Sequence, residues 1–66
     1  MRFIAIENNG STDKVIINAD HICSMFLDGG AVVITTADGK DLRTKFTDVD
    51  HAVDFIQRAS SVSLGR

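Results

Sequence analysis

The sequence of 66 residues contains a single cysteine, Cys23, and neither tryptophan nor tyrosine. A lone cysteine forms no internal disulfide, and the chain has no paired Cys/His spacing typical of structural zinc. Two common ways of stabilising a very small domain are therefore excluded. Ordering a residue costs roughly 1.5 kcal/mol while burial returns about 25 cal/mol per Å², so we expect self-association to supply further buried surface.

The sequence also lacks a long apolar run. Met1 to Ile6 is followed at once by Glu7 and two asparagines, and such a segment is too short and too polar for a signal peptide or a membrane span. The net charge is −2, which gives no overall attraction to phosphate. Together with the unpaired thiol, these features predict a cytoplasmic protein without membrane association, and they disfavour nucleic acid as a partner.

The length allows one domain with one core. We expect residues 1–59 to form this domain, and residues 60–66, which have no helix-forming bias, to be a flexible tail. A chain of this size leaves no room for a second domain that closes a substrate cleft, so the sequence predicts a protein that is not an enzyme.

The clearest structural signal lies in residues 31–46, where two runs with the two-residue period of a β-strand flank Asp38-Gly39. This pair readily takes the positive φ angles of a tight hairpin turn. The second arm alternates between a set expected on one face and a charged set expected in water, namely Leu42, Thr44 and Phe46 against Asp41, Arg43 and Lys45.

Three further strands are predicted before this hairpin. Alternating or β-branched residues indicate strands at 2–7, 14–18 and 21–27, separated by a polar loop at 8–13, a bend at 18–20 and a Gly-Gly turn at 28–30. In the third strand either face could be buried, because the alternation places apolar residues on both. One face would carry His21, Cys23, Met25 and Leu27, and the other Ile22, Ser24 and Phe26.

The period changes to that of a helix after Thr47. A single apolar stripe with i, i+3, i+4 and i+7 spacing predicts a helix from about Asp48 to about Ala59, with Thr47 as its N-cap and Asp50 at the third helical position. The stripe consists of Val49, Ala52, Val53, Ile56 and Ala59, broadened by Phe55. We expect it to pack across the sheet, which gives an α+β fold: an antiparallel sheet of four or five strands with one C-terminal helix.

Two groups of residues resemble chemical sites. Asp20, His21 and Cys23 lie close together in the sequence, and His21 and Cys23 would share a strand face. A ligand from the helix, Asp50, His51 or Asp54, could complete a tetrahedral metal site, but the spacing matches no zinc motif. A Cys–His nucleophile pair would lack a glycine-rich helix start to stabilise an oxyanion. We therefore expect no metal, no cofactor and no catalytic residues.

A basic stripe on the hairpin is the candidate nucleic-acid surface. Such a surface normally interleaves its cations with aromatic platforms for the bases, and the four phenylalanines lie where a core would bury them. The residues that would contact nucleic acid under this alternative are Arg2, Lys14, Lys40, Arg43 and Lys45.

The stretch from Val15 to Ile22, the hairpin carrying Asp38-Gly39-Lys40 and the short helix together resemble a group of very small bacterial and phage proteins. The named group among them is the FlbD-like family of small flagellar and motility proteins, and the resemblance covers most of residues 3–57. It implies a compact β-rich domain with a covering helix, and it supplies no catalytic residues.

The sequence thus predicts a small interaction or structural module that self-associates or docks to a protein partner through a sheet edge or face. Several strands carry apolar residues on both faces, and one short helix does not cover two faces, so a homodimer or small oligomer is expected. The alternative is a small nucleic-acid-binding regulator that uses the basic hairpin face.

Overall fold

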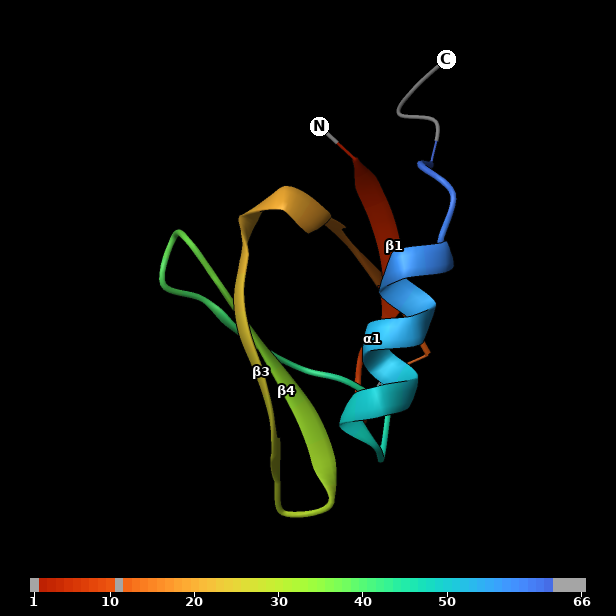
Figure 1. The fold of residues 1–66 in the computed structure, drawn as a ribbon. Helices are drawn as coiled ribbons and strands as arrows, with labels where there is room; N and C mark the ends of the chain where they lie inside the picture. The colour runs from red at the N-terminus through yellow and green to blue at the C-terminus, as the bar shows by residue number, and fades with distance from the viewer. Residues whose placement is uncertain (1, 11, 63–66) are drawn as a thin grey trace.

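The computed structural model describes residues 2–10 and 12–62, and the fold is α+β as predicted (Figure 1). Within these residues, five strands, one short 3₁₀ turn and one helix follow one another. They are β1 (Phe3–Glu7), β2 (Lys14–Asn18), η1 (Ala19–His21), β3 (Ile22–Asp28), β4 (Ala31–Thr36), β5 (Asp41–Arg43) and α1 (Val49–Arg58).

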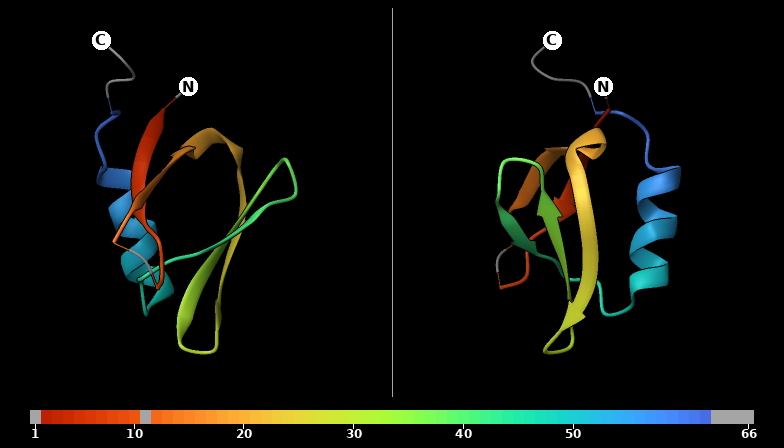
Figure 2. Two further views of the ribbon diagram at one scale, coloured as in Figure 1. Left: turned by 180° about the vertical axis from the view of Figure 1, so that it is seen from behind. Right: turned by 60° about the vertical axis from the view of Figure 1, so that its left-hand side comes forward.

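The strands form two antiparallel sheets. β1 pairs with β2 over its whole length, and β3, β4 and β5 form a three-stranded meander with β4 in the middle. The sheets meet where an isolated bridge pairs Asn8 with Thr44, and two backbone bonds, Asn9 N to Arg43 O at 2.9 Å and Lys45 N to Glu7 O at 3.2 Å, extend this junction. From there the sheets diverge and enclose the core, as Figure 2 shows.

The central strand β4 is buried on both faces, since all four residues from Ala31 to Ile34 are buried. Two glycines with positive φ angles, Gly29 and Gly30, connect it to β3. At Gly29 an added Cβ would lie 2.8 Å from Nη2 of Arg43, which donates to the Asp28 carbonyl. This turn therefore favours glycine for its positive backbone φ angle.

The turn at Asp38-Gly39 differs from the expected two-residue form. Of the two, only Gly39 has a positive φ angle, and the bonds Gly39 N to Thr36 O and Thr36 N to Lys40 O enclose a three-residue loop. This is the geometry of a type I turn followed by a left-handed glycine. The hairpin itself is present, and Thr44 on its second arm is fully buried while Asp41, Arg43 and Lys45 are exposed.

Neither of the two faces considered for residues 21–27 is buried as a unit. The register with β4 shifts between Ile22 and Ser24, so a bulge at Cys23 resets the alternation. As a result Ile22 and Met25, which the simple pattern places on opposite faces, both pack against the core. The strand also begins and ends one residue later than predicted.

The helix α1 covers the core with the predicted stripe. Ala52 and Ile56 are buried, and Ile56 joins Ile4, Ile6 and Ile34 in the central cluster. The expected N-cap is wrong by one residue: the Asp48 carboxylate, not Thr47, accepts the backbone N–H of His51. The charged oxygen of Asp48 also suits the positive end of the helix dipole.

The N-terminal arm and the segment after the helix are held together. Nη1 of Arg2 donates to the carbonyls of Ile56 and Ala59 at 2.7 and 2.8 Å, and Val62 N donates to Phe3 O at 2.8 Å. The beginning of the expected tail therefore lies beside β1. Residues 63–66, the rest of that expectation, lie outside the described part of the chain.

Candidate functional site

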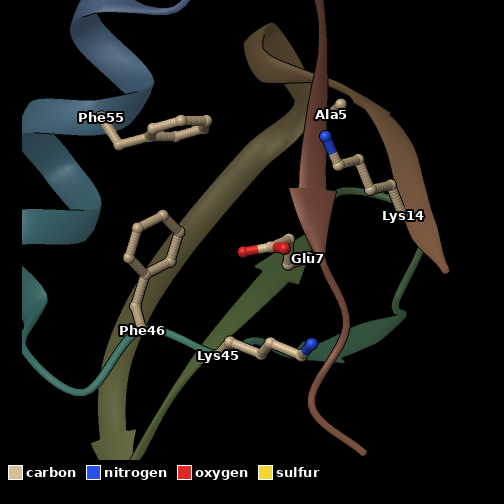
Figure 3. A pocket seen from close by; sticks show the side chains of 6 residues that line it. All are labelled: Ala5, Glu7, Lys14, Lys45, Phe46 and Phe55. Atoms are coloured by element: carbon tan, nitrogen blue, oxygen red, sulfur yellow. The ribbon is translucent and has the colours of Figure 1, made fainter. Parts of the chain in front are cut away.

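A groove in the surface of the described residues lies beside β1. We call it the β1 groove; it has a volume of about 290 Å³ and is lined by Ala5, Glu7, Lys14, Lys45, Phe46 and Phe55. These residues come from β1, β2, the segment after β5 and the helix. Figure 3 shows the two phenylalanine rings on the helix side of the groove and the charged side chains around β1.

The wall of the β1 groove on the helix side is aromatic. The rings of Phe46 and Phe55 have centroids 5.3 Å apart and planes inclined at 52°, a favourable tilted contact. Phe46 also packs against the core, whereas Phe55 remains 41% exposed. The pair therefore presents a fixed apolar surface to solvent.

The opposite side of the β1 groove carries three charged groups. Glu7 and Lys14 are cross-strand partners, and Lys45 follows β5. Within residues 2–10 and 12–62 no ion pair joins Glu7 to either lysine. The groove thus combines two ammonium groups, one carboxylate and an aromatic wall.

The second groove, of about 310 Å³, lies between β2 and the β4–β5 hairpin, and we call it the hairpin groove. Ile16, Asn18, His21, Thr36, Asp38 and Lys40 are among the residues that line it. The Thr36 hydroxyl donates to the Asp38 carboxylate, and this bond is the main reason that the pKa of Asp38 is lowered, with a smaller contribution from Lys40.

Replacing Thr36 with valine is expected to raise the pKa of Asp38 toward its ordinary value, because the bond to the charged form is lost. In the native protein the Asp38 contribution to stability is present above the unfolded-state pKa and disappears as the pH falls through the lower folded-state pKa. A carboxyl-carbon NMR titration of both proteins measures this shift. Thr35→Val is the control, since the hydroxyl of Thr35 pairs with Ser24; equal titration of Asp38 in all three proteins would contradict the expectation.

The structure brings only two of the five candidate nucleic-acid residues into one groove. Lys14 and Lys45 share the β1 groove, while Lys40 lines the hairpin groove. Arg2 binds carbonyls at the end of α1, and Arg43 pairs with the Asp28 carboxylate at 3.2 Å.

The residues considered for metal binding or nucleophilic chemistry are not assembled. Cys23 is a free, exposed thiol whose Sγ lies 3.9 Å from the carbonyl oxygen of His21. His51 lies on the helix with Nδ1 3.6 Å from an Asp48 carboxylate oxygen. Among the residues that the structure describes, no group of three or more His, Cys, Asp or Glu side chains is placed to hold a metal ion.

Exposed apolar side chains mark a third feature, on β3. Phe26 and Leu27 are 44% and 54% exposed. Together with Met25 they form what we call the β3 edge, because β3 has β4 as a neighbour on one side and no strand of the described chain on the other. The sequence analysis placed all four phenylalanines where a core would bury them, and for Phe26 this prediction is wrong.

No family model, curated protein or solved structure matches this chain. In residues 2–10 and 12–62 there is also no helix with the length and apolar character needed to cross a bilayer.

Proposed function

We propose that the protein is a non-enzymatic interaction module that self-associates through the β3 edge, with a homodimer as the principal species. The observation that carries this proposal is an unpaired strand edge beside two exposed apolar side chains, Phe26 and Leu27. An edge strand with no strand partner on one side is a template for pairing with another strand.

The hydrogen-bond pattern identifies the backbone groups that are free on the β3 edge. Val32 exchanges backbone bonds with the segment after β5, donating to Phe46 O and accepting from Thr44 N. In an antiparallel sheet the backbone N–H and C=O groups of successive residues point to opposite edges of the strand. Those of Val33 therefore point to β3 and bond Phe26, its cross-strand partner. The N–H and C=O groups of Met25 and Leu27 therefore point outward.

Charge distinguishes the β3 edge from the edge formed by β5. Asp28, the last residue, is the only charged residue in β3, whereas β5 carries Asp41 and Arg43. Charged side chains on an edge strand oppose indiscriminate pairing. Their absence from most of β3 supports pairing at this edge rather than at β5.

A twofold-symmetric pairing accounts for both features of the β3 edge. Two antiparallel β3 strands centred near Met25 would satisfy the outward backbone groups of both copies. The same arrangement would bring Leu27 of each copy against the apolar surface of the other. This surface would supply the burial that such a small chain needs. The resemblance to the FlbD-like family implies a compact β-rich domain with a covering helix and supplies no catalytic residues.

The proposal places the protein in the cytoplasm, where an exposed and unpaired Cys23 stays reduced. The alternative role, a nucleic-acid-binding regulator, has less support. Arg2 and Arg43 bind carbonyl and carboxylate groups of the protein itself, which leaves the remaining lysines in two separate grooves.

Replacing Leu27 with lysine is expected to convert the dimer to a monomer, raising the dimer dissociation constant roughly tenfold or more. Each copy would then press a lysine ammonium against the apolar surface of the other, and burying an unpaired charge is strongly unfavourable. Light scattering coupled to size-exclusion chromatography, over a dilution series and with reductant, measures the mass of both proteins.

Ile16→Lys is the matched control, because Ile16 is an apolar β2 residue with similar exposure, 45%. It should leave the mass unchanged. A native protein that is monomeric at every concentration would refute self-association, and a dimer that Ile16→Lys disrupts but Leu27→Lys does not would refute the β3 edge as its interface.

A further inference from the structure

We propose that the β1 groove binds an extended segment of a partner protein that carries an aromatic side chain beside acidic residues. This inference adds a second surface to the interaction role proposed above. It uses no residue of the β3 edge, so the two proposals succeed or fail separately.

The backbone of β1 has one open position in this groove. On the side of β1 away from β2, the Phe3 carbonyl accepts from Val62 and the Glu7 carbonyl accepts from Lys45. The backbone N–H and C=O groups of Ala5 point to the same side, because Ala5 lies two residues from Phe3 and two from Glu7. No backbone hydrogen bond joins it across that edge to any residue in 2–10 or 12–62.

The opening is short. Phe3 and Glu7 are four residues apart in a strand, which corresponds to roughly 13 Å. A bound segment can therefore pair with β1 through about one residue before it meets the chain on either side. Such a site suits a short linear segment rather than a whole additional strand, and its affinity has to come mainly from side chains.

The aromatic wall supplies an apolar contact for one side chain. Phe46 and Phe55 are already in tilted contact, and Phe55 is 41% exposed, so an incoming ring would pack on a surface that is formed in advance. A preformed contact costs little ordering of the protein on binding. An aromatic residue of the partner gains most here, since tilted ring pairs contribute beyond their buried area.

The charged side chains of the β1 groove determine which residues of the partner segment can lie beside its aromatic ring. Two lysines and one glutamate give the groove a net charge of +1 on a protein whose total is −2. No described carboxylate lies within ion-pair distance of Lys14 or Lys45. Figure 3 shows the two lysine side chains lying on different sides of Glu7, so carboxylates on both sides of the aromatic residue would each meet an ammonium group. The complementary segment is therefore acidic and aromatic.

The test is an NMR titration of the full ¹⁵N-labelled chain with two capped pentapeptides. Both have a central phenylalanine; one flanks it with aspartates and the other with lysines. The acidic peptide is expected to shift the amide signals of Ala5 and Lys45 and to bind at least about tenfold more tightly than the basic one. Its affinity should fall as salt is added.

Lys45→Glu is expected to weaken binding of the acidic peptide roughly threefold to tenfold, the range for reversing one partly exposed charge. Lys40→Glu is the matched control, because Lys40 is an exposed lysine outside the β1 groove, and it should have no effect. Repeating the titration in the Leu27→Lys variant should give the same affinity, which separates this site from the β3 edge.

Three results would overturn the proposal. The first is no change at Ala5 with either peptide up to about 1 mM, a concentration at which even weak sites fill. The second is equal binding of the acidic and basic peptides. The third is a change at Ala5 that follows protein concentration alone, which would identify the occupant of the groove as another copy of this chain.

Discussion

Replacing Ile34 with alanine is expected to lower the free energy of unfolding by about 2–5 kcal/mol. Ile34 has no exposed surface and lies at the centre of the core, on the middle strand of the meander, between Met25 and Leu42. Removing its outer carbons both loses their burial and leaves a cavity that rigid strands on both sides cannot close. A chain of this length has a total stability of about 3–10 kcal/mol, so the loss is a large fraction of the whole.

Urea unfolding followed by circular dichroism, at one fixed protein concentration, measures the effect of Ile34→Ala. The matched control is Ile16→Ala, the same chemical change at a side chain that is 45% exposed, for which we expect a loss below about 1 kcal/mol. Similar losses at the two positions would show that Ile34 does not occupy the centre of the core.

Replacing Arg2 with methionine is expected to cost about 2–3 kcal/mol. One guanidinium nitrogen donates to the carbonyls of Ile56 and Ala59, which no helical N–H can reach because the helix ends at Arg58. The positive charge also lies at the negative end of the helix dipole. Methionine keeps an apolar stem but leaves both carbonyls without this donor.

Arg58→Met provides the comparison for Arg2→Met, because Arg58 lies on the same helix but forms an exposed ion pair with Asp54 at 2.9 Å. Exposed pairs of this spacing contribute only about 0.3–0.5 kcal/mol. Urea unfolding of the two variants should differ by more than 1 kcal/mol. Equal destabilisation would mean that Arg2 does not hold the end of the helix.

Much of the fold could be predicted from local patterns. β2 has the predicted bounds, and the helix and the other four strands occur where periodicity indicated them, with shifts of one or a few residues. The helix stripe also buries the expected side chains, Ala52 and Ile56. These features depend on residues close in sequence, and their side-chain period is a direct consequence of backbone geometry.

The local errors have local causes too. Thr47 and Asp48 are adjacent residues that can both cap a helix, and the choice depends on where the chain leaves the sheet. Asp38-Gly39 suits either a two-residue or a three-residue hairpin loop, and the register between β4 and β5 decides between them. The bulge at Cys23 has no sequence signal that we can identify.

Less of the candidate site than of the fold could be predicted from the sequence. Lys14 and Lys45 were predicted as members of a basic stripe, but nothing in the pattern places them around Glu7 or beside an aromatic wall. Phe46 and Phe55 were assigned to the core, and Phe55 instead remains partly in solvent. The groove exists because the segment after β5 and the helix both approach β1, and these contacts join residues about 40 or more positions apart.

The sequence by itself determined the α+β class, the strands, the helix and its buried stripe, because each follows from propensity and periodicity within a few residues. The tertiary structure alone decided which apolar side chains stay exposed, where Arg2 binds, and which charged groups share a groove. Those properties depend on how two sheets diverge from the junction at Asn8 and Thr44 and on how the helix packs against the core. Contacts between residues so far apart in the chain produce no periodic pattern in the sequence.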